Sequence, residues 1–328
     1  MTGRYEHVLS FALSHPWAVM PEMLSVIAGI LARRMAGVDV ERAEIEAALV
    51  NRKNLPQPRA GSVAIIPVYG VIAPRMNLMS EMSGGTTYEK LSGHLREAMA
   101  NKAIRTIVLD VDSPGGSVAG NAEFAAEILR ARTKKPIVAV AQYTMGSAAY
   151  HLGSAATEIV AAPSASVGSI GTFMIHNDLS AAMDKLGIKK TFIAAGEGKV
   201  DGNDTGPPSD AYMARSTALV NKAYDQFVGN VVKGRGKGTT SEKVRDDWKA
   251  HVYGASEALS MGMIDAIGTL DDTIARLLSA SPDAEDQRAA LDFHSADGTD
   301  QELPAMAATS QDHQAMLDLQ RQVLEMQL

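Results

Sequence analysis

Residues 106–120, TIVLDVDSPGGSVAG, decide the fold. The apolar run that opens this stretch lacks strict alternation of apolar and polar residues, which is typical of a strand covered on both faces. A predicted helix over 119–132 and a second apolar run, PIVAVA at 136–141, follow it. Two strands joined by a helix of this length are typically parallel and linked by a right-handed crossover. We therefore predict an α/β fold.

The same alternation of strands and helices continues on both sides of this stretch. Further strands are predicted at 62–73, 158–162 and 189–195. Further helices are predicted at 87–100, 147–156, 179–186, 210–233 and 255–261. The pattern indicates a largely parallel sheet with helices packed on its faces.

Composition divides the chain into successive segments. Apolar residues at helical spacing predict a helical N-terminal extension over 1–50, and the Pro-containing stretch 51–61 is typical of a linker. The main domain is predicted over 62–278. Residues 279–328 have too few large apolar residues to offset chain entropy, so we expect a mostly disordered tail. A short amphipathic helix is predicted at its end from the 3-4-3 spacing of Met316, Leu319, Val323 and Met326.

The charge of the protein is concentrated in that tail. Residues 280–328 hold ten Asp and Glu residues against two Arg, which gives −8, whereas the whole chain carries −7. The body is therefore close to neutral, and we expect no nucleic-acid partner. The absence of cysteine excludes disulfides, thiolate metal sites and a cysteine nucleophile. We also find no histidine or carboxylate spacing typical of a metal site, and we expect no cofactor.

The apolar run MLSVIAGILA at 23–32 is about ten residues long, roughly half of what a membrane span needs. No basic segment followed by an apolar one and a small-residue cleavage site opens the chain, so we expect no secretory signal. These observations predict a cytoplasmic protein without a membrane anchor.

Ser147 is the first candidate nucleophile, because it follows the strand at 136–141 and opens the next predicted helix. At that position the free N–H groups of a helix start favour an alkoxide, and the Ala148 amide could form an oxyanion hole with the turn at Gly115 and Gly116. An alternative interpretation is that Ser147 only caps the helix.

A serine nucleophile needs a base, and two residues could supply it. Lys199 lies in the glycine-rich loop GEGKVDGND, and a lysine accepts a proton only if burial removes its charge. His176 needs no such change, and Asp178 or Asp112 could orient it. His151, one helical turn after Ser147, is more typical of a structural helix residue.

Five motifs occur together in one order and spacing, which resembles the signal peptide peptidase A family of serine proteases. The resemblance covers residues 62–270. The motifs are DSPGG, MGSAAYHLGSAATEIV, SVGSIG, GEGKVDG and HVYGASEALSMGMIDAIG. It implies a fold of the ClpP/crotonase type, built from repeated ββα and βαβ units.

The resemblance also implies roles for individual residues. Ser147 matches the nucleophile of a Ser-Lys dyad and Lys199 matches its general base. Ser169 matches a serine that orients the lysine, and the glycine turn at 115–116 completes the oxyanion hole with Ala148. In shorter members the serine and lysine of one site come from neighbouring protomers, which implies a homo-oligomer.

The N-terminal extension, the GKVDGND loop and the acidic tail look like the capsid-assembly, or head maturation, proteases of tailed bacteriophages. The function implied is a serine endopeptidase that processes scaffold or capsid proteins, with capsid, portal or scaffold proteins as partners. Ala148 and Ala149 stand where the family often has glycines, which could narrow the site. Three alternatives stay open: a ClpP-like peptidase using Ser147 and His176, a catalytically silent assembly protein, and a crotonase-like acyl-CoA enzyme.

Overall fold

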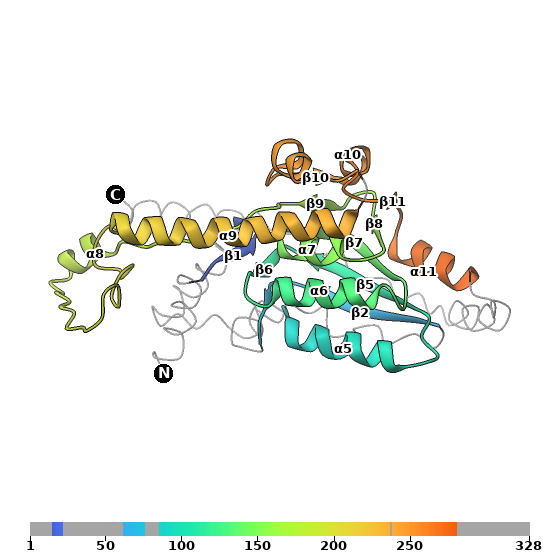
Figure 1. Ribbon diagram of the computed structural model, residues 1–328, viewed down its shortest axis with the longest axis horizontal. Coiled ribbons are helices and arrows are strands. Elements are labelled where there is room, and N and C mark those ends of the chain that lie inside the picture. The colour runs from blue at the N-terminus through green and yellow to red at the C-terminus, as the bar shows by residue number, and fades with distance from the viewer. Residues whose placement is uncertain (1–14, 22–61, 76–84, 237, 281–328) are drawn as a thin grey trace, which may run out of the picture. The chain divides into compact units, whose positions relative to one another are not determined.

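A largely parallel seven-stranded sheet carries the fold (Figure 1). The computed structural model describes residues 15–21, 62–75, 85–236 and 238–280. The sheet runs β10-β9-β7-β5-β2, with β8 paired to β7 and β11 paired to β8. Its only antiparallel pair among these strands is β10 with β9. The strands are β2 (Val63–Tyr69), β5 (Thr106–Ser113), β7 (Ile137–Gly146), β8 (Glu158–Ala161), β9 (Ser166–Gly168), β10 (Val252–Gly254) and β11 (Ala266–Ile267).

A second, four-stranded sheet lies where the chain leaves β5, and its strand order is β1-β6-β3-β4. β6 contains both glycines of the predicted turn and pairs antiparallel with β1. The strands of this sheet are β1 (Trp17–Val19), β3 (Ile72–Ala73), β4 (Thr86–Thr87) and β6 (Gly115–Ser117).

Helices cover the sheet and begin at recognisable caps. The hydroxyl oxygens of Thr87, Ser209 and Thr269 each accept a hydrogen bond from a main-chain amide of the first turn of the helix that follows. The helices are α5 (Tyr88–Ala100), α6 (Asn121–Ala131), α7 (Ala148–Ser154), α8 (Ser180–Lys185), α9 (Asp210–Arg235), the π-helix η2 (Lys243–Trp248), α10 (Ala255–Met261) and α11 (Leu270–Ser279).

Both faces of the sheet are buried, as the apolar runs predict. Along β5, Ile107 and Leu109 belong to the core shared with α5, α6 and α7. Val108, between them, belongs to a smaller core on the other face that includes Ile274 of α11. Successive residues of a strand point to opposite faces, so a strand between two cores is apolar throughout. The predicted α/β class and largely parallel sheet are confirmed.

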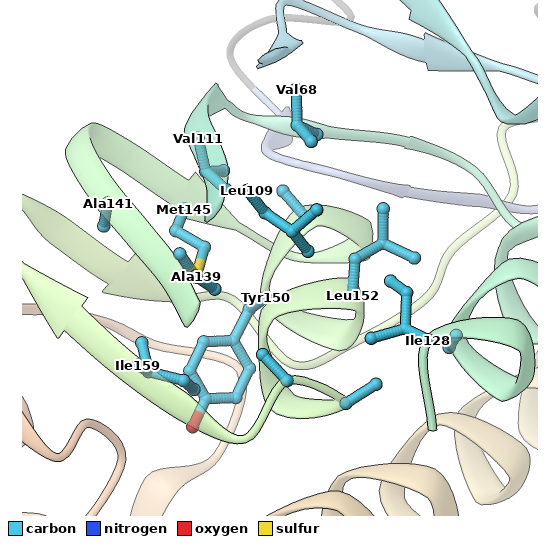
Figure 2. Close-up of a cluster of buried hydrophobic side chains, with 14 of the residues drawn as sticks. Val68, Leu109, Val111, Ile128, Ala139, Ala141, Met145, Tyr150, Leu152 and Ile159 are labelled. Carbon is cyan, nitrogen blue, oxygen red and sulfur yellow. The ribbon is translucent and has the colours of Figure 1, made fainter. Parts of the chain in front are cut away.

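Helix α7 is packed most tightly, since all seven of its residues are buried. Figure 2 shows Tyr150 and Leu152 of this helix among side chains of β5, β7 and β8. The Tyr150 hydroxyl donates a hydrogen bond to the Met263 carbonyl at 2.8 Å, and the Tyr150 ring meets Trp248 edge-on. These contacts fix the residue that precedes the helix, Ser147.

Helix α9 packs closely against the C-terminal end of α7. Gly234 lies so close to it that a methyl group on Gly234 would be 2.1 Å from the Ser154 carbonyl oxygen. Arg132 links the two elements, because its guanidinium donates to the carbonyls of Ala155, Ala156 and Gly234 at 3.3, 2.6 and 2.9 Å.

The structure departs from the sequence predictions at two places. Residues 189–195 form no strand, and Ile193 among them is 99% exposed, because no strand of the described residues pairs with them. Residues 17–19, placed in a helical extension, form β1 instead, since β6 offers them a partner. The predicted linker, the rest of the extension and nearly all of the predicted tail lie outside the described residues.

No helix among the described residues is both long and apolar enough to cross a bilayer.

We predict that Gly234→Ala lowers the free energy of unfolding by about 1–3 kcal/mol, because its methyl group must push α9 away from α7. Gly229→Ala is the matched control in the same helix, since nothing lies within 4 Å of the position that its methyl group would take. We expect it to stabilise the protein by about 0.5–1 kcal/mol. Urea denaturation measures both, and equal effects of the two variants would contradict this packing.

Candidate active site

Ser147 stands between β7 and α7 with a backbone conformation that is rare for a residue with a side chain. Its φ is 52° and its ψ is −117°. Such a conformation costs on the order of 1–3 kcal/mol and is concentrated at functional sites. The Ser147 side chain makes no capping hydrogen bond to α7, so the interpretation that it only caps the helix is wrong.

The backbone of Ser147 is held firmly, whereas its hydroxyl is not. The Ser147 amide donates to the Gly168 carbonyl at 2.7 Å, and its carbonyl accepts from the His151 amide at 3.0 Å. The hydroxyl donates to the Gly171 carbonyl at 3.4 Å, which is long for a bond between oxygens. Ser147 is 1% exposed. The side chain is therefore positioned by its backbone and weakly bonded itself.

The glycine turn lies against the start of α7. A methyl group on Gly115, whose φ is +107°, would lie 3.0 Å from both the Ala148 amide nitrogen and the Gly146 carbonyl oxygen. A methyl group on Gly116 would lie 2.0 Å from the Ile72 carbonyl oxygen. The 2.0 Å distance excludes a side chain at Gly116, and the 3.0 Å distances together with the positive φ disfavour one at Gly115, so the close approach of these backbone segments favours glycine at both positions.

Ser113 changes the expected oxyanion hole. The Gly115 amide donates to the Ser113 hydroxyl at 3.1 Å, and that hydroxyl donates to the Gly70 carbonyl at 2.6 Å. The Gly115 amide is therefore already used, and the Gly116 and Ala148 amides remain as candidate donors. Sequence reasoning missed Ser113, although its place in the DSPGG motif could have suggested a role in holding the turn.

Ser169 lies next to the nucleophile through the pairing of β7 with β9. Gly146 is opposite Gly168 in that pairing, which puts Ser169 directly after the residue that binds the Ser147 amide. Ser169 is buried, has a φ of 56°, and its amide donates to the His251 carbonyl at 2.6 Å. The structure thus brings together Ser147, Ser169 and the glycine turn.

Lys199 is not brought to Ser147 within one chain. It lies in the exposed segment between α8 and α9, and no contact of the described residues joins it to Ser147. Figure 1 shows α8 beyond the N-terminal end of α9, away from the sheet. Asp201, which could have kept the lysine charged, pairs instead with Arg215, and Lys190 pairs with Asp204 at 2.7 Å.

His176, the alternative base, is also bound away from Ser147. His176 Nε2 lies 3.1 Å from the Gly206 carbonyl oxygen, and its ring packs against Tyr212. Asp178 accepts hydrogen bonds from Ser180, which lower the pKa of the Asp178 carboxyl. Among the described residues neither side chain contacts Ser147.

His151 is a buried structural residue on the inner side of α7. Its Nδ1 is hydrogen-bonded to the Asn121 side-chain oxygen and its ring stacks on Phe227 with centroids 4.6 Å apart. Burial lowers the pKa of His151 to about 3, so the ring is neutral at physiological pH. His151 therefore has a structural role, through its packing and its hydrogen bond, and does not act as a general base.

Within the described part of the chain, no three His, Cys, Asp or Glu side chains are placed to hold a metal ion. The reactive groups that the structure gathers are a hydroxyl and backbone amides. Such groups suit acyl transfer to a serine.

The sequence profile described as Peptidase family S49 matches residues 130–281, a range that includes Ser147, Ser169 and Lys199. This region belongs to peptidase family S49. The match confirms the resemblance that the five motifs predict, and this region is called the S49 domain.

Two curated relatives of the S49 domain come from bacteriophages. Capsid assembly protease C of Escherichia phage lambda is 33% identical over 212 residues, covering 65% of this chain and 48% of that protein. Head-tail preconnector protein GP5 of Enterobacteria phage P21 is 28% identical over 257 residues, covering 78% of this chain and 49% of that protein. The chain spans about half the length of each.

A solved structure with detectable likeness to this S49 domain is the 1510-N membrane-bound stomatin-specific protease in complex with a substrate peptide. It is 15% identical, with a TM-score of 0.40, and the match covers 66% of this chain and 79% of that one.

We predict that His151 makes the protein sensitive to acid. Its folded pKa of about 3 lies below the unfolded value near 6.5, so only the unfolded state takes up a proton as the pH falls between these values. Stability should drop by up to about 1.4 kcal/mol per pH unit on this account.

The measurement is the free energy of unfolding at pH 7 and pH 5 for the unchanged protein and for His151→Gln. The loss on acidification should be about 2 kcal/mol smaller in the variant, whatever its stability at pH 7. His94→Gln, on α5, is the control and should keep the full loss. An equal loss in His151→Gln would show that burial of this ring is not the cause.

Proposed function

We propose that this chain is a serine endopeptidase that cuts peptide bonds through an acyl-enzyme on Ser147, with Lys199 of a neighbouring copy as general base. The observation that carries the proposal is the Ser147 backbone at positive φ, with an uncapped hydroxyl, next to the place where the glycine turn meets the Ala148 amide. A strained strand-to-helix turn of this kind is how serine nucleophiles are exposed on other α/β folds.

The proposed reaction assigns each proton. Ser147 Oγ attacks the carbonyl carbon of the substrate while its proton passes to the neutral amine of Lys199. The oxygen that becomes negative accepts hydrogen bonds from the Gly116 and Ala148 amides. The lysine then protonates the leaving amine, and water hydrolyses the acyl-enzyme by the same route in reverse. Ser169 would orient the lysine.

Sharing of the site between copies is supported by the surface around Lys199. Five large apolar side chains in residues 179–193 are exposed, which is more than single surface hydrophobics account for. They are Leu179, Leu186, Ile188, Phe192 and Ile193. Met213 and Leu219 on α9 are exposed as well. Burial of this surface against a second copy would take the lysine out of water, which favours its neutral form.

The biological setting proposed is head assembly of a tailed phage or prophage in the host cytoplasm, with scaffold or capsid proteins as substrates. It is supported by the similarity to capsid assembly protease C of phage lambda. Portal proteins are further candidate partners. This chain matches only about half the length of each phage relative, so the activity of the whole protein is part of this proposal.

We expect Ser147→Ala and Lys199→Ala each to reduce casein hydrolysis on the order of 10⁴-fold, because nucleophile and base act as one unit. His176→Ala should keep the activity, since its ring is bound to Gly206 and Tyr212. The reverse pattern, with activity lost in His176→Ala and kept in Lys199→Ala, would favour the ClpP-like alternative. Full activity of Ser147→Ala would refute a serine peptidase.

Mixing the two inactive variants tests whether copies share a site. A Lys199→Ala chain still has its serine, and a neighbouring Ser147→Ala chain can supply the lysine. Equal, random mixing should restore about one quarter of the unmixed protein's activity if one neighbour supplies each base. Ser147→Ala mixed with the double variant is the control and should stay inactive. No recovery in assemblies shown by native mass spectrometry to be mixed would contradict the shared site.

A further inference from the structure

The chain places its own strand where the proposed active site would take a peptide. β1 pairs antiparallel with β6, with Trp17 opposite Ser117, Ala18 opposite Gly116 and Val19 opposite Gly115. On its other side the Trp17 amide donates to the Phe173 carbonyl at 2.8 Å, and the Phe173 amide donates to the Trp17 carbonyl at 3.0 Å. β1 is therefore inserted between the glycine strand and the segment that follows Ser169.

The segment continues directly past the nucleophile. The Met20 amide donates to the Pro114 carbonyl at 2.9 Å. The Met20 sulfur lies 3.0 Å from the position of a methyl group on Gly146, the residue before Ser147. The chain from 17 to 20 thus crosses the site in an extended conformation and in one defined register.

This register brings one carbonyl to the candidate oxyanion donors. The position that a methyl group on Gly115 would take serves as a reference point. The Ala18 carbonyl oxygen lies 2.2 Å from it, and the Ala148 amide nitrogen lies 3.0 Å from it. Ala18 also lies opposite Gly116, the other candidate donor. Of the peptide bonds in β1, the one between Ala18 and Val19 is therefore presented to the site.

The side chain of Ala18 fits the space that the protein leaves for it. It lines a cavity of about 10 Å³ together with Asn121, His151, Thr172 and Phe227. Ala18 is 2% exposed, and the cavity beside it has about the size of one water molecule, so it leaves no room for a bulky side chain. A site of this shape selects a small residue on the acyl side of the bond that is cut.

We propose that Ala18–Val19 is an internal cleavage site, cut by Ser147 of the same chain; this inference rests on the proposed peptidase function. Ser147 Oγ bonds to the Ala18 carbonyl carbon and the bond to the Val19 nitrogen breaks. The hydroxyl proton passes through the general base to the Val19 amine. Water then releases Ala18 as a carboxylate and restores the serine hydroxyl.

Two consequences follow for the order of events. Ser147 is 1% exposed with β1 in place, so other peptides reach it only after β1 leaves. Lys199 lies away from Ser147 of its own chain, so the cut waits for a neighbouring copy to supply the base. Assembly would therefore first remove the segment that fills the site and then open it to other substrates.

The test is intact-mass analysis and N-terminal sequencing of the full purified chain, with Ser147→Ala as the uncut reference. The unchanged protein should lose residues 1–18 and begin at Val19. Ala18→Phe should slow this cut by about 10- to 100-fold, because the ring cannot enter the cavity. Ala18→Ser, which stays small, is the matched control and should be cut like the unchanged protein.

Casein hydrolysis, measured on the same samples, separates this inference from the function on which it rests. A protein that hydrolyses casein through Ser147 but keeps residues 1–18, or is cut at another bond, would overturn the internal site alone. Cutting of Ala18→Phe at the original bond and rate would overturn the role of the cavity. A protein inactive on both casein and itself would overturn the proposed function and the internal site together.

Discussion

The position of Ser147 depends on one local constraint, a backbone turn at positive φ that its own side chain disfavours. The strain of on the order of 1–3 kcal/mol must be offset by the surroundings. They supply a hydrogen bond from the Ser147 amide to Gly168 and a helix, α7, that is buried along its whole length. The hydroxyl is placed by packing around it, which leaves it without a strong hydrogen bond of its own.

That constraint explains where the chain uses glycine. Backbone meets backbone at Gly115, Gly116 and Gly168, where added methyl groups would lie 2.2, 2.0 and 2.4 Å from carbonyl oxygens. Only 5% of the residues are aromatic, which fits a site built from closely approaching main chains. Catalysis by backbone amides needs such approach, because the donors cannot reach across a layer of side chains.

The sequence predicts what local patterns determine. The apolar runs at 106–111 and 136–141 are strands because both faces of the sheet are covered, and Ser147 follows the second as predicted. The sequence does not predict pairing between distant segments. Residues 17–19 are a strand because β6, about 100 residues later, binds them, and 189–195 have a strand-like composition without a partner. The separation of Lys199 from Ser147 likewise depends on the path of the whole chain.

The two features that keep a single chain inactive in our proposal act on the same hydroxyl by different means. Distance withholds the base, and the paired strand β1 excludes other peptides. A strand held at both edges is displaced slowly by a competing peptide, since the competitor must first replace hydrogen bonds to β6 and to Phe173. Cleavage removes this obstacle, because the fragment before Val19 loses its connection to the rest of the chain. The uncut enzyme can thus remain inactive among its substrates until its copies assemble. The free energy for opening the site then comes from hydrolysis of its own peptide bond.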